Sequence, residues 1–519
     1  MAVTSLLTSL EDFEGAGPTF VSYGGGPGAT VNTDIFIEGA QSAGRRVDNT
    51  TDSGFGWQVT STDLSAAGVH MKLWLFVTQW ASVTQVQVKI SDGTNDDDHE
   101  LPTGQFPALG GFIPVWVDVS RTPEVGGSAN EAAITEVAVL LDIGNVGGNA
   151  QNLIVDENQY GTSGLRWDGA SGTFGSFRTF EGTNNEGNLV TLNGVDFCYS
   201  RLEIGSATAT TFTDSGFTII FPDQTLVAST FMGLTFDLQN ASTDVTLSNA
   251  TVQSADPAGA TVRPDLIVTG TSGTLALTNM SFIGLRTADL TSGVTITGGI
   301  YELLNLTQNG ATITGATIRP NTASGVALCN DFTVADVNDT TFAQAGSGHA
   351  IEITTPGTYS FDALFFEGFG GTPGTNATPS SGANDAAIYN NSGGAVTINI
   401  INGGDTPSVR NAASSTTTVN NTVTVTVEVV DESGTPIQNA RVLLEAAAGG
   451  DLAAGTDILT GLTNASGIVE TTAFAYTNPQ PVTGRVRKAT TSPFYKTGAI
   501  TGTINAAGFS TTVQMILDE

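Results

Sequence analysis

The sequence of 519 residues is poor in basic side chains. Seventeen lysines and arginines stand against 50 aspartates and glutamates, which gives a formal net charge of −33 at pH 7. No lysine occurs between Lys89 and Lys488. A surface of this charge repels nucleic acid and anionic membranes, so we expect neither as a direct partner.

Cysteine and histidine are also scarce, with two and three residues respectively. Cys198 and Cys329 could form one disulfide, but two separate buried thiols are the interpretation we prefer. The histidines, His70, His99 and His349, are scattered and show no zinc-ligand spacing. No nucleophile elbow, P-loop or dinucleotide fingerprint lies between a strand and a helix.

Long apolar runs are missing as well. No stretch of 18 apolar residues occurs, and the first ten residues carry neither a basic segment nor a long apolar core, so no membrane span and no secretory signal are predicted. Yet 63 glycines, many Thr, Ser, Asn and Val residues and only 13% charged residues are typical of an almost wholly β, adhesin-like protein. A virion protein, made in a host cytoplasm and released by lysis, reconciles the two observations.

Short segments of one kind recur between Val245 and Phe366. In each, apolar residues alternate with small or polar ones and Asn or Gly closes the run, which predicts a strand followed by a turn. The intervals between their central apolar residues vary from 17 to 30 residues, which suits a coil with stacked strands and unequal loops. The pattern resembles right-handed parallel β-helices of the pectate-lyase and phage-tailspike kind. The central residues are Leu247, Leu277, Ile296, Ile313, Val334 and Phe361.

Residues 1–165 hold four of the five tryptophans and several alternating apolar segments. This part opens with Glu11-Asp-Phe-Glu-Gly15 and closes with Leu153-Ile-Val-Asp-Glu157. It resembles a jelly-roll β-sandwich of the carbohydrate-binding-module type, in which two such ends lie on adjacent strands. The resemblance implies a structural Ca²⁺ held by Glu11, Asp12 or Glu14 together with Asp156. The alternative is that these residues are solvated strand-end acids.

Sugar binding by such a module requires exposed aromatic rings beside amide or carboxylate groups. Trp57 and Trp80 are the candidates, because Trp74 and Trp116 lie inside alternating apolar strands and are expected in the core. The acidic run 95–100 is a candidate for a second cation site, with a solvated loop tip as the alternative.

Residues 166–411 are expected to form a capping region followed by the β-helix. The Gly- and Ser-rich stretch 166–230 would cover the exposed edge of the first coil. The first coil strands are expected at 189–197, 217–221 and 233–238. Residues 412–418, rich in Ala, Ser and Thr, are typical of a linker.

The last part, residues 419–519, carries two turn motifs. Asp431-x-x-Gly-x-Pro436, with Ala440 and Val442 after it, is followed by Asn464-x-x-Gly467. The combination is similar to carboxypeptidase-regulatory-like and bacterial Ig-like modules, which implies a seven-stranded sandwich used as a spacer. The run from residue 423 to 444 is expected to form a hairpin.

Two coil segments are apolar on both sides. Phe361 and Phe365 have one parity, whereas Leu364 and Phe366 have the other, and residues 300–306 show the same feature. A strand that is apolar on both sides must be covered on both sides, by another subunit or by a long loop. We expect the cover to be a neighbouring copy in a parallel homotrimer.

A β-helix also suits polysaccharide lyases and glycosidases. Glycoside hydrolysis requires two carboxylates about 5 to 10 Å apart. The nearest cluster is Asp336, Asp339, Asp362 and Glu367. Most acids stand singly at turns, however, and the coils contain no lysine, so we do not expect an enzyme.

The sequence therefore predicts an all-β protein with an N-terminal jelly-roll β-sandwich, a central right-handed parallel β-helix and a C-terminal Ig-like β-sandwich. The expected function is that of a structural bacteriophage virion protein, a homotrimeric spike, fibre or capsid-attached appendage on the virion surface. Its expected partners are its own copies, other virion proteins of the capsid, collar or tail, and cell-surface glycan. A tailspike depolymerase and a bacterial surface adhesin are the alternatives.

Overall fold

The computed structural model divides into two compact units, residues 1–311 and 312–519. The described residues are 3–518 without 15–16, 25–26, 37–39, 48–51, 103–111, 144–150, 163, 169–188, 193–194, 199, 223–231, 256–262, 322–326, 331–335, 345–347, 371–385, 476–478 and 506. All regular elements in these ranges are strands apart from short 3-10 turns. Among them, no helix is long and apolar enough to cross a membrane.

The first unit begins with two antiparallel sheets whose facing side chains form one apolar core. This is the β-sandwich that the sequence predicts. The first sheet has the order β10 (Phe112–Asp118), β7 (His70–Val77), β13 (Gln151–Gly161), β5 (Ser42–Val47), β4 (Thr30–Asn32), with β2 (Thr8–Glu11) also paired to β13. The second has the order β11 (Val125–Gly126), β9 (Asp96–Pro102), β8 (Val83–Ser91), β12 (Ile134–Ile143), β6 (Ser53–Thr62), β3 (Phe20–Tyr23).

The first residues of the chain do not join this sandwich. Strand β1 (Val3–Ser5) pairs antiparallel with β14 (Leu165–Trp167), whose other neighbour is the coil strand β17 (Arg201–Gly205). The N-terminal segment therefore covers the outer edge of β14, as a cap must. Of the stretch predicted to cap the coils, residues 169–188 lie outside the described residues.

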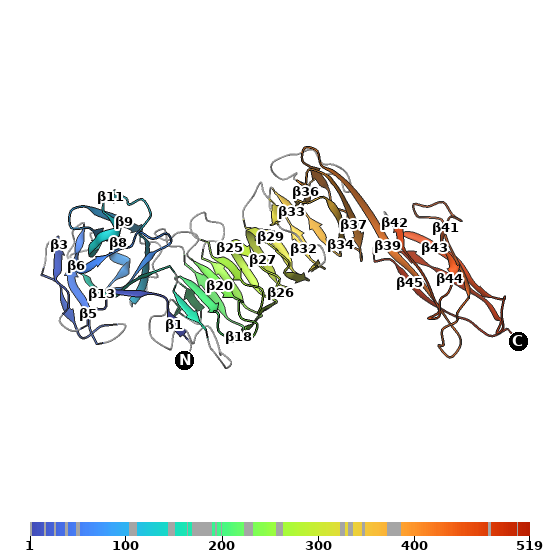
Figure 1. The fold of residues 1–519 in the computed structure, drawn as a ribbon, viewed down its shortest axis with the longest axis horizontal. Coiled ribbons are helices and arrows are strands. Elements are labelled where there is room, and N and C mark those ends of the chain that lie inside the picture. The colour runs from blue at the N-terminus through green and yellow to red at the C-terminus, as the bar shows by residue number, and fades with distance from the viewer. Residues whose placement is uncertain are drawn as a thin grey trace. The chain divides into compact units, whose positions relative to one another are not determined.

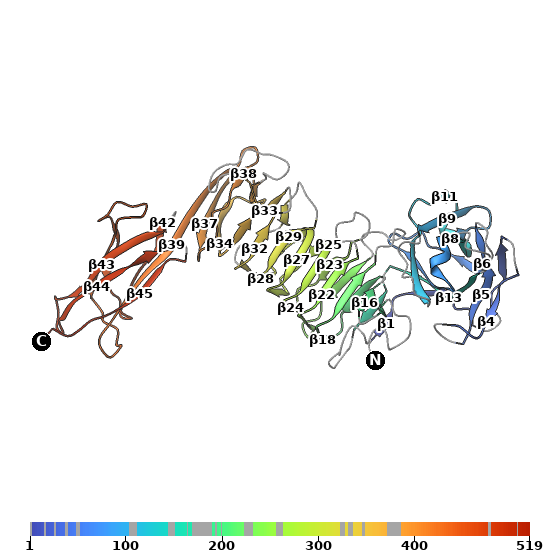
Figure 2. The same ribbon diagram turned by 180° about the vertical axis from the view of Figure 1, so that it is seen from behind.

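The rest of the first unit is a stack of coils with three strands per turn, paired in parallel (Figure 1). One ladder contains β17, β20 (Gly233–Asp237) and β23 (Asp265–Thr269). A second contains β16 (Val195–Cys198), β19 (Thr218–Phe221), β22 (Thr251–Ser254), β25 (Ser281–Asp289) and β27 (Ile300–Thr307). A third contains β18 (Thr211–Ser215), β21 (Asp244–Ser248), β24 (Thr274–Thr278) and β26 (Val294–Thr297). This is the stacked parallel arrangement of a β-helix, and Figure 2 shows it from behind.

The predicted register is confirmed in the third ladder. Leu247 is paired with Leu277, and Leu277 with Ile296, so the intervals of 30 and 19 residues each span one coil. All three side chains are buried in the interior of the stack. Residues 189–197 differ from the prediction in part, because β15 (Leu189–Leu192) pairs antiparallel with β16, whereas β16 itself pairs in parallel with the coil strand β19.

Asn and Gly close the strands of this ladder because the chain turns there with a positive φ. Asn249 and Asn279 have φ values of 51° and 50°, and the side chain of Asn279 donates a hydrogen bond to that of Asn249. In the next coil Gly298 takes this position, where a Cβ would lie 2.4 Å from Oδ1 of Asn279. The left-handed conformation favours Asn and Gly, which explains why the sequence repeats them.

The second unit begins with the same kind of coil. One ladder contains β29 (Thr317–Pro320), β32 (Thr341–Ala343) and β35 (Phe365–Glu367). A second contains β30 (Ala327–Asn330), β33 (His349–Ile353), β36 (Ile388–Asn390) and β38 (Val409–Asn411). A third contains β28 (Thr312–Thr314), β31 (Val337–Asn338), β34 (Gly357–Asp362), β37 (Ala395–Ile401) and β39 (Thr416–Val430). The partner of Ile313 is Val337 and not Val334, which lies outside the described residues. The predicted register is therefore wrong by three residues at this coil.

Corners of the coil account for the strands that are apolar on both sides. Ala363 turns the chain with a φ of 49°, so Phe361 before it and Leu364 after it both point inward and are fully buried. In β27 the inward residues are Tyr301, Leu303 and Leu306, and the spacing changes from two to three along the strand. A corner inverts the parity, so a single chain buries some residues of each set, whereas Leu304, Phe365 and Phe366 stay half-buried.

Strand β39 joins the last coil to the C-terminal sandwich without a linker (Figure 1). Residues 416–421 pair in parallel with β37, and residues 422–430 pair with β42 (Ile468–Ala475) and β45 (Phe509–Gln514). The linker predicted at 412–418 is therefore wrong, because threonines 416–418 already belong to the coil strand. Their β-branched side chains suit a strand as well as a polar linker.

Seven strands, β39 to β45, form the predicted C-terminal sandwich. Its second sheet has the order β41 (Asp457–Leu462), β40 (Arg441–Ala446), β43 (Gln480–Lys488), β44 (Tyr495–Ile504). The expected 423–444 hairpin is wrong, since β39 and β40 lie in different sheets. The turn between them is as predicted, with Oδ1 of Asp431 accepting hydrogen bonds from the backbone N–H groups of Ser433 and Thr435.

We predict that Leu277→Ala destabilises the coils by about 2 to 5 kcal/mol, because it leaves a cavity in the stacked interior. Urea unfolding followed by circular dichroism measures the change. Thr246→Ala is the matched control, because Thr246 faces outward and its partner one coil on is already Ala276. Equal losses in both variants would contradict the assigned register.

Candidate functional site

One face of the second sandwich sheet carries amide, carboxylate, hydroxyl and ammonium groups. In β8 the side chains of Val86, Val88 and Ile90 enter the core, so the residues between them point the other way. The same alternation on the neighbouring strands brings their polar residues to this face. We call this set the polar face: Tyr23, Gln58, Gln85, Gln87, Lys89, Asp96, Asp98, Glu100 and Glu136.

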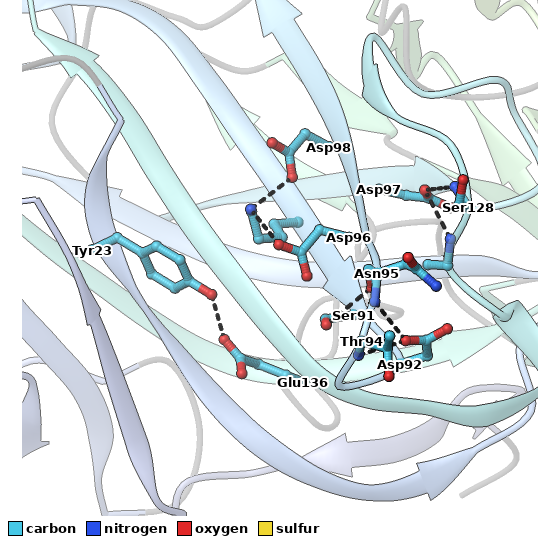
Figure 3. Close-up of polar contacts among 12 residues, drawn as sticks. Tyr23, Ser91, Asp92, Thr94, Asn95, Asp96, Asp97, Asp98, Ser128 and Glu136 are labelled. Atoms are coloured by element: carbon cyan, nitrogen blue, oxygen red, sulfur yellow. Dashed lines mark hydrogen bonds and ion pairs between the residues drawn. The ribbon is translucent and has the colours of Figure 1, made fainter.

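Glu136 is the centre of one hydrogen-bonded group on the polar face (Figure 3). Its Oε1 accepts a hydrogen bond of 2.6 Å from the Tyr23 hydroxyl, and its Oε2 accepts one of 2.6 Å from the Gln58 amide. A Cβ on Gly56 would lie 2.9 Å from Oε1 of Glu136, so glycine leaves room for this contact. Burial and the hydrogen bond to Glu136 both raise the pKa of Tyr23, which keeps its hydroxyl protonated as a donor.

Lys89 is the centre of a second group. Its Nζ lies 3.0 Å from Oδ2 of Asp96 and 3.3 Å from Oδ1 of Asp98, and 5.4 Å from the centroid of the Tyr23 ring. Burial alone would lower the pKa of Lys89, but the two carboxylates outweigh it and the pKa is raised. The ammonium therefore stays charged and links the two groups into one polar surface.

The acidic run 95–100 is not a loop tip, because residues 96–100 belong to β9. Oδ1 of Asp97 is buried and accepts hydrogen bonds from three consecutive backbone N–H groups, those of residues 127–129 (Figure 3). Asp92 binds the backbone of Thr94 and Asn95 in the same way, and its backbone hydrogen bonds lower its pKa to about 2. These acids thus hold loops in place.

The two ends of the sandwich lie side by side, as the sequence predicts, because β2 pairs with β13 and Glu11 lies opposite Asn158. Each of the four predicted calcium ligands already accepts a backbone hydrogen bond at one carboxylate oxygen. Oδ1 of Asp12 accepts the N–H of Glu14, and Oε1 of Glu14 accepts the N–H groups of residues 40 and 41. Oε1 of Glu11 accepts the N–H of Phe13, and Oδ1 of Asp156 accepts that of Glu157. Glu11 and Asp156 are the candidates that lie on the paired strands β2 and β13.

Asn158 was missed by the sequence prediction and fits the same site. Its side chain is fully buried, and neither its amide oxygen nor its amide nitrogen has a hydrogen-bond partner. Asp156 is also fully buried. No group of three His, Cys, Asp or Glu side chains that could hold a metal occurs among the described residues. We propose that a Ca²⁺ ion at this end of the sandwich would take the unpartnered Asn158 amide oxygen together with the carboxylates of Glu11, which lies opposite Asn158, and of Asp156.

Trp57 and Trp80 do not form the predicted glycan-stacking surface. Their side chains are 0% and 4% exposed, and the Trp57 ring packs edge-on against Phe13 with centroids 5.2 Å apart. Trp57 shares its inward parity with Phe55 on β6, a signal that the sequence already contained. Tyr23 is the aromatic residue of the polar face, and the alternating polar residues of β8 were the missed signal.

The four acids considered for catalysis do not form one cluster. Asp339 and Asp362 lie in successive coils, each just after or at the end of a strand of the same ladder. The N–H of Asp339 donates a hydrogen bond to the carbonyl of Asp362. Oδ1 of Asp362 accepts a hydrogen bond from Asn402. Glu367 lies at the end of β35 in another ladder, and Asp336 precedes β31. The geometry separates Glu367 from Asp339 and Asp362.

Comparisons with known proteins find solved structures that are similar to about 30% of the chain. No protein-family model matches the sequence, and no curated protein matches it. A family 11 carbohydrate-binding module from Clostridium thermocellum, solved with a mixed-linked tetrasaccharide, has 15% identity and a TM-score of 0.22 over 30% of this chain and 95% of that one. The xylan-binding domain CBM22-1 from Paenibacillus barcinonensis has 14% identity and a TM-score of 0.19 over 31% of this chain and 94% of that one. An exo-β-agarase matches with 11% identity and a TM-score of 0.22, over 29% of this chain and 24% of that one.

We predict that Ca²⁺ raises the melting temperature of the N-terminal sandwich and that EDTA reverses the effect. Binding to the folded state alone adds about 2.7 kcal/mol at a ligand concentration of 100 Kd. Asp156→Asn should remove the response. Glu14→Gln is the control, since it loses one charge but keeps the acceptor for the turn. Differential scanning calorimetry of the full chain measures both, and an unchanged response in Asp156→Asn would disprove the ligand assignment.

Proposed function

We propose that this protein is a non-enzymatic structural component of a bacteriophage virion that adheres to host-surface glycan through the polar face of its N-terminal sandwich. The observation that carries the adhesive role is the set of amide, carboxylate, hydroxyl and ammonium groups on neighbouring strands of one sheet. Such a surface matches the many donors and acceptors of a sugar chain. Parallel copies on one particle would add weak contacts through avidity.

The stacked coils support the structural part of the proposal. Within each unit, parallel main-chain ladders join successive described coils, and their apolar side chains fill the interior. Strand β39 pairs with β37 of the coils in its first part and with β45 of the C-terminal sandwich in its second part. One continuous strand thus takes part in both the last coil and the C-terminal sandwich, which suits a structural appendage. Its attachment to capsid, collar or tail is part of the proposal.

The depolymerase alternative has one structural feature in its favour. A hollow of about 250 Å³ in the second unit is lined by Phe366, Phe369 and Asp405, together with small and polar residues from 387 to 408. Among the described residues, Asp405 is the one acid that lines it, and its Oδ2 accepts the N–H of Phe366 at 3.0 Å. Hydrolysis requires two carboxylates. We therefore propose binding without cleavage.

We predict that Tyr23→Ala and Glu136→Ala each weaken glycan binding by roughly tenfold, since each removes hydrogen bonds of the polar face. Affinity electrophoresis in gels containing β-glucan, xylan or host capsular polysaccharide measures the retardation. Thr60→Ala, exposed on the same strand β6 as Gln58, serves as the control. Retardation that survives both polar-face variants would place adhesion elsewhere.

We predict a homotrimer in solution, with three times the chain mass of 53.2 kDa in light scattering. Although corners bury one parity within a single chain, Leu304, Phe365 and Phe366 remain half-buried, and a neighbouring copy would cover them. Phe365→Ser with Phe366→Ser should shift the protein toward monomer. Immunogold labelling of released phage particles tests the virion assignment separately. A monomeric wild type would refute the trimer, and unlabelled particles would refute the virion role.

A further inference from the structure

The C-terminal sandwich gathers its positive charge on one sheet. Between residues 419 and 519 the chain has five basic residues, and all of them lie on β40, β43 and β44. They are Arg441, Arg485, Arg487, Lys488 and Lys496. The whole chain carries a net charge of −33, so this concentration stands out against its surroundings.

Strand alternation directs three of these residues to the outer face. Val442, Leu444 and Val486 enter the core of the sandwich, and Arg441, Arg485 and Arg487 therefore point away from it. Arg441 lies directly opposite Arg487, and Arg485 lies opposite Leu443 on the same face. Like charges in opposed positions of adjacent strands destabilise a sheet unless an anion lies between them.

No carboxylate of the described residues forms an ion pair with these three arginines. The nearest acid on their face, Glu445, lies opposite Thr483 and Asp457. In contrast, arginines of the coils form ion pairs with carboxylates. Arg201 and Arg286 both pair with the buried carboxylate of Asp265, and Arg166 pairs with Glu203. The C-terminal arginines thus keep their hydrogen-bonding capacity for a ligand.

A hollow of about 550 Å³ lies over this face and is lined by the three arginines, Leu443 and Thr497. This volume falls within the range of about 300 to 1,000 Å³ that is usual for small-molecule sites. It exceeds the needs of a single inorganic anion and suits one or two sugar rings. Guanidinium groups bind carboxylates with two parallel hydrogen bonds, Thr497 can bond a sugar hydroxyl, and Leu443 offers an apolar contact.

We propose that this hollow binds the carboxylate-bearing sugar of an acidic polysaccharide, a hexuronate unit. Two features favour such a ligand over an acidic protein surface: the site is concave, and its lining combines charge with hydroxyl and apolar groups. Duplex nucleic acid is disfavoured because three arginines cannot offset the charge of the rest of the chain. The site lies on a different sandwich from the polar face and does not depend on it.

The experiment measures binding of the full-length protein to oligogalacturonate by calorimetry, at low and high salt. Arg441→Ala and Arg487→Ala should each weaken binding roughly tenfold or more. Arg487→Lys should also weaken it, because an ammonium keeps the charge but not the paired hydrogen bonds. Lys496→Ala is the control, since it removes one exposed charge from the same sheet outside the hollow, and it should change binding less than about twofold.

Several results would overturn the proposal. They are absence of oligogalacturonate binding, equal losses in Lys496→Ala and Arg441→Ala, and full binding by Arg487→Lys. Polyglutamate or dextran sulfate that binds as tightly as oligogalacturonate would assign the site to acidic peptides or to anions in general. Tyr23→Ala should leave this binding unchanged, so failure of the polar-face proposal is distinguishable from failure of this one. Far-UV circular dichroism checks that each variant is folded.

Discussion

Parallel main-chain pairing between successive coils is the constraint on which the rest of this protein depends. Each coil strand donates and accepts hydrogen bonds with the coils on either side, so an inward side chain must stack on the inward side chain of its neighbours. Leu247, Leu277 and Ile296 show the result, with one buried column despite intervals of different length. Loop length is free under this constraint, whereas strand register is not.

The corners of the coils are the second consequence of the pairing. A chain that turns within one coil needs positive φ at fixed positions, and Asn249, Asn279 and Gly298 supply it in successive coils. Each corner also resets which parity points inward, as it does at Ala363. Apolar residues on both sides of a segment therefore do not by themselves require a partner subunit, and the proposed trimer depends on the half-buried side chains that remain.

The two sandwiches carry surface chemistry of opposite character. On the polar face one ammonium, Lys89, lies among four carboxylates and forms ion pairs with two of them, Asp96 and Asp98, so this face remains net negative. On the C-terminal sheet three arginines share a hollow that no described acid lines. An exposed ion pair contributes little to stability, but an unmatched cluster concentrates potential at one point of the surface. The first surface suits neutral or mixed sugar groups, whereas the second suits carboxylates.

Local patterns in the sequence determined the strands, the turns and the division into sandwich, coils and sandwich. Alternation with a period of two identifies an inward column, and Asn or Gly marks a corner, because both depend on neighbouring residues alone. The same reasoning located the adjacent ends around Glu11 and Asp156 through their resemblance to a known type of sandwich. The inward parity of Trp57 was also present in the sequence, because it matches that of Phe55 on the same strand.

Only the tertiary structure decided which residues meet across strands. The partner of Ile313, the sheet change between β39 and β40, and the opposition of Arg441 to Arg487 depend on pairing between distant segments. Sites follow the same rule, because Tyr23 meets Glu136 across 113 positions of the chain. A periodic pattern specifies the side of a strand but not its neighbour, since many registers satisfy the same alternation. The polar face and the arginine hollow therefore belong to the fold and could not be read from the chain.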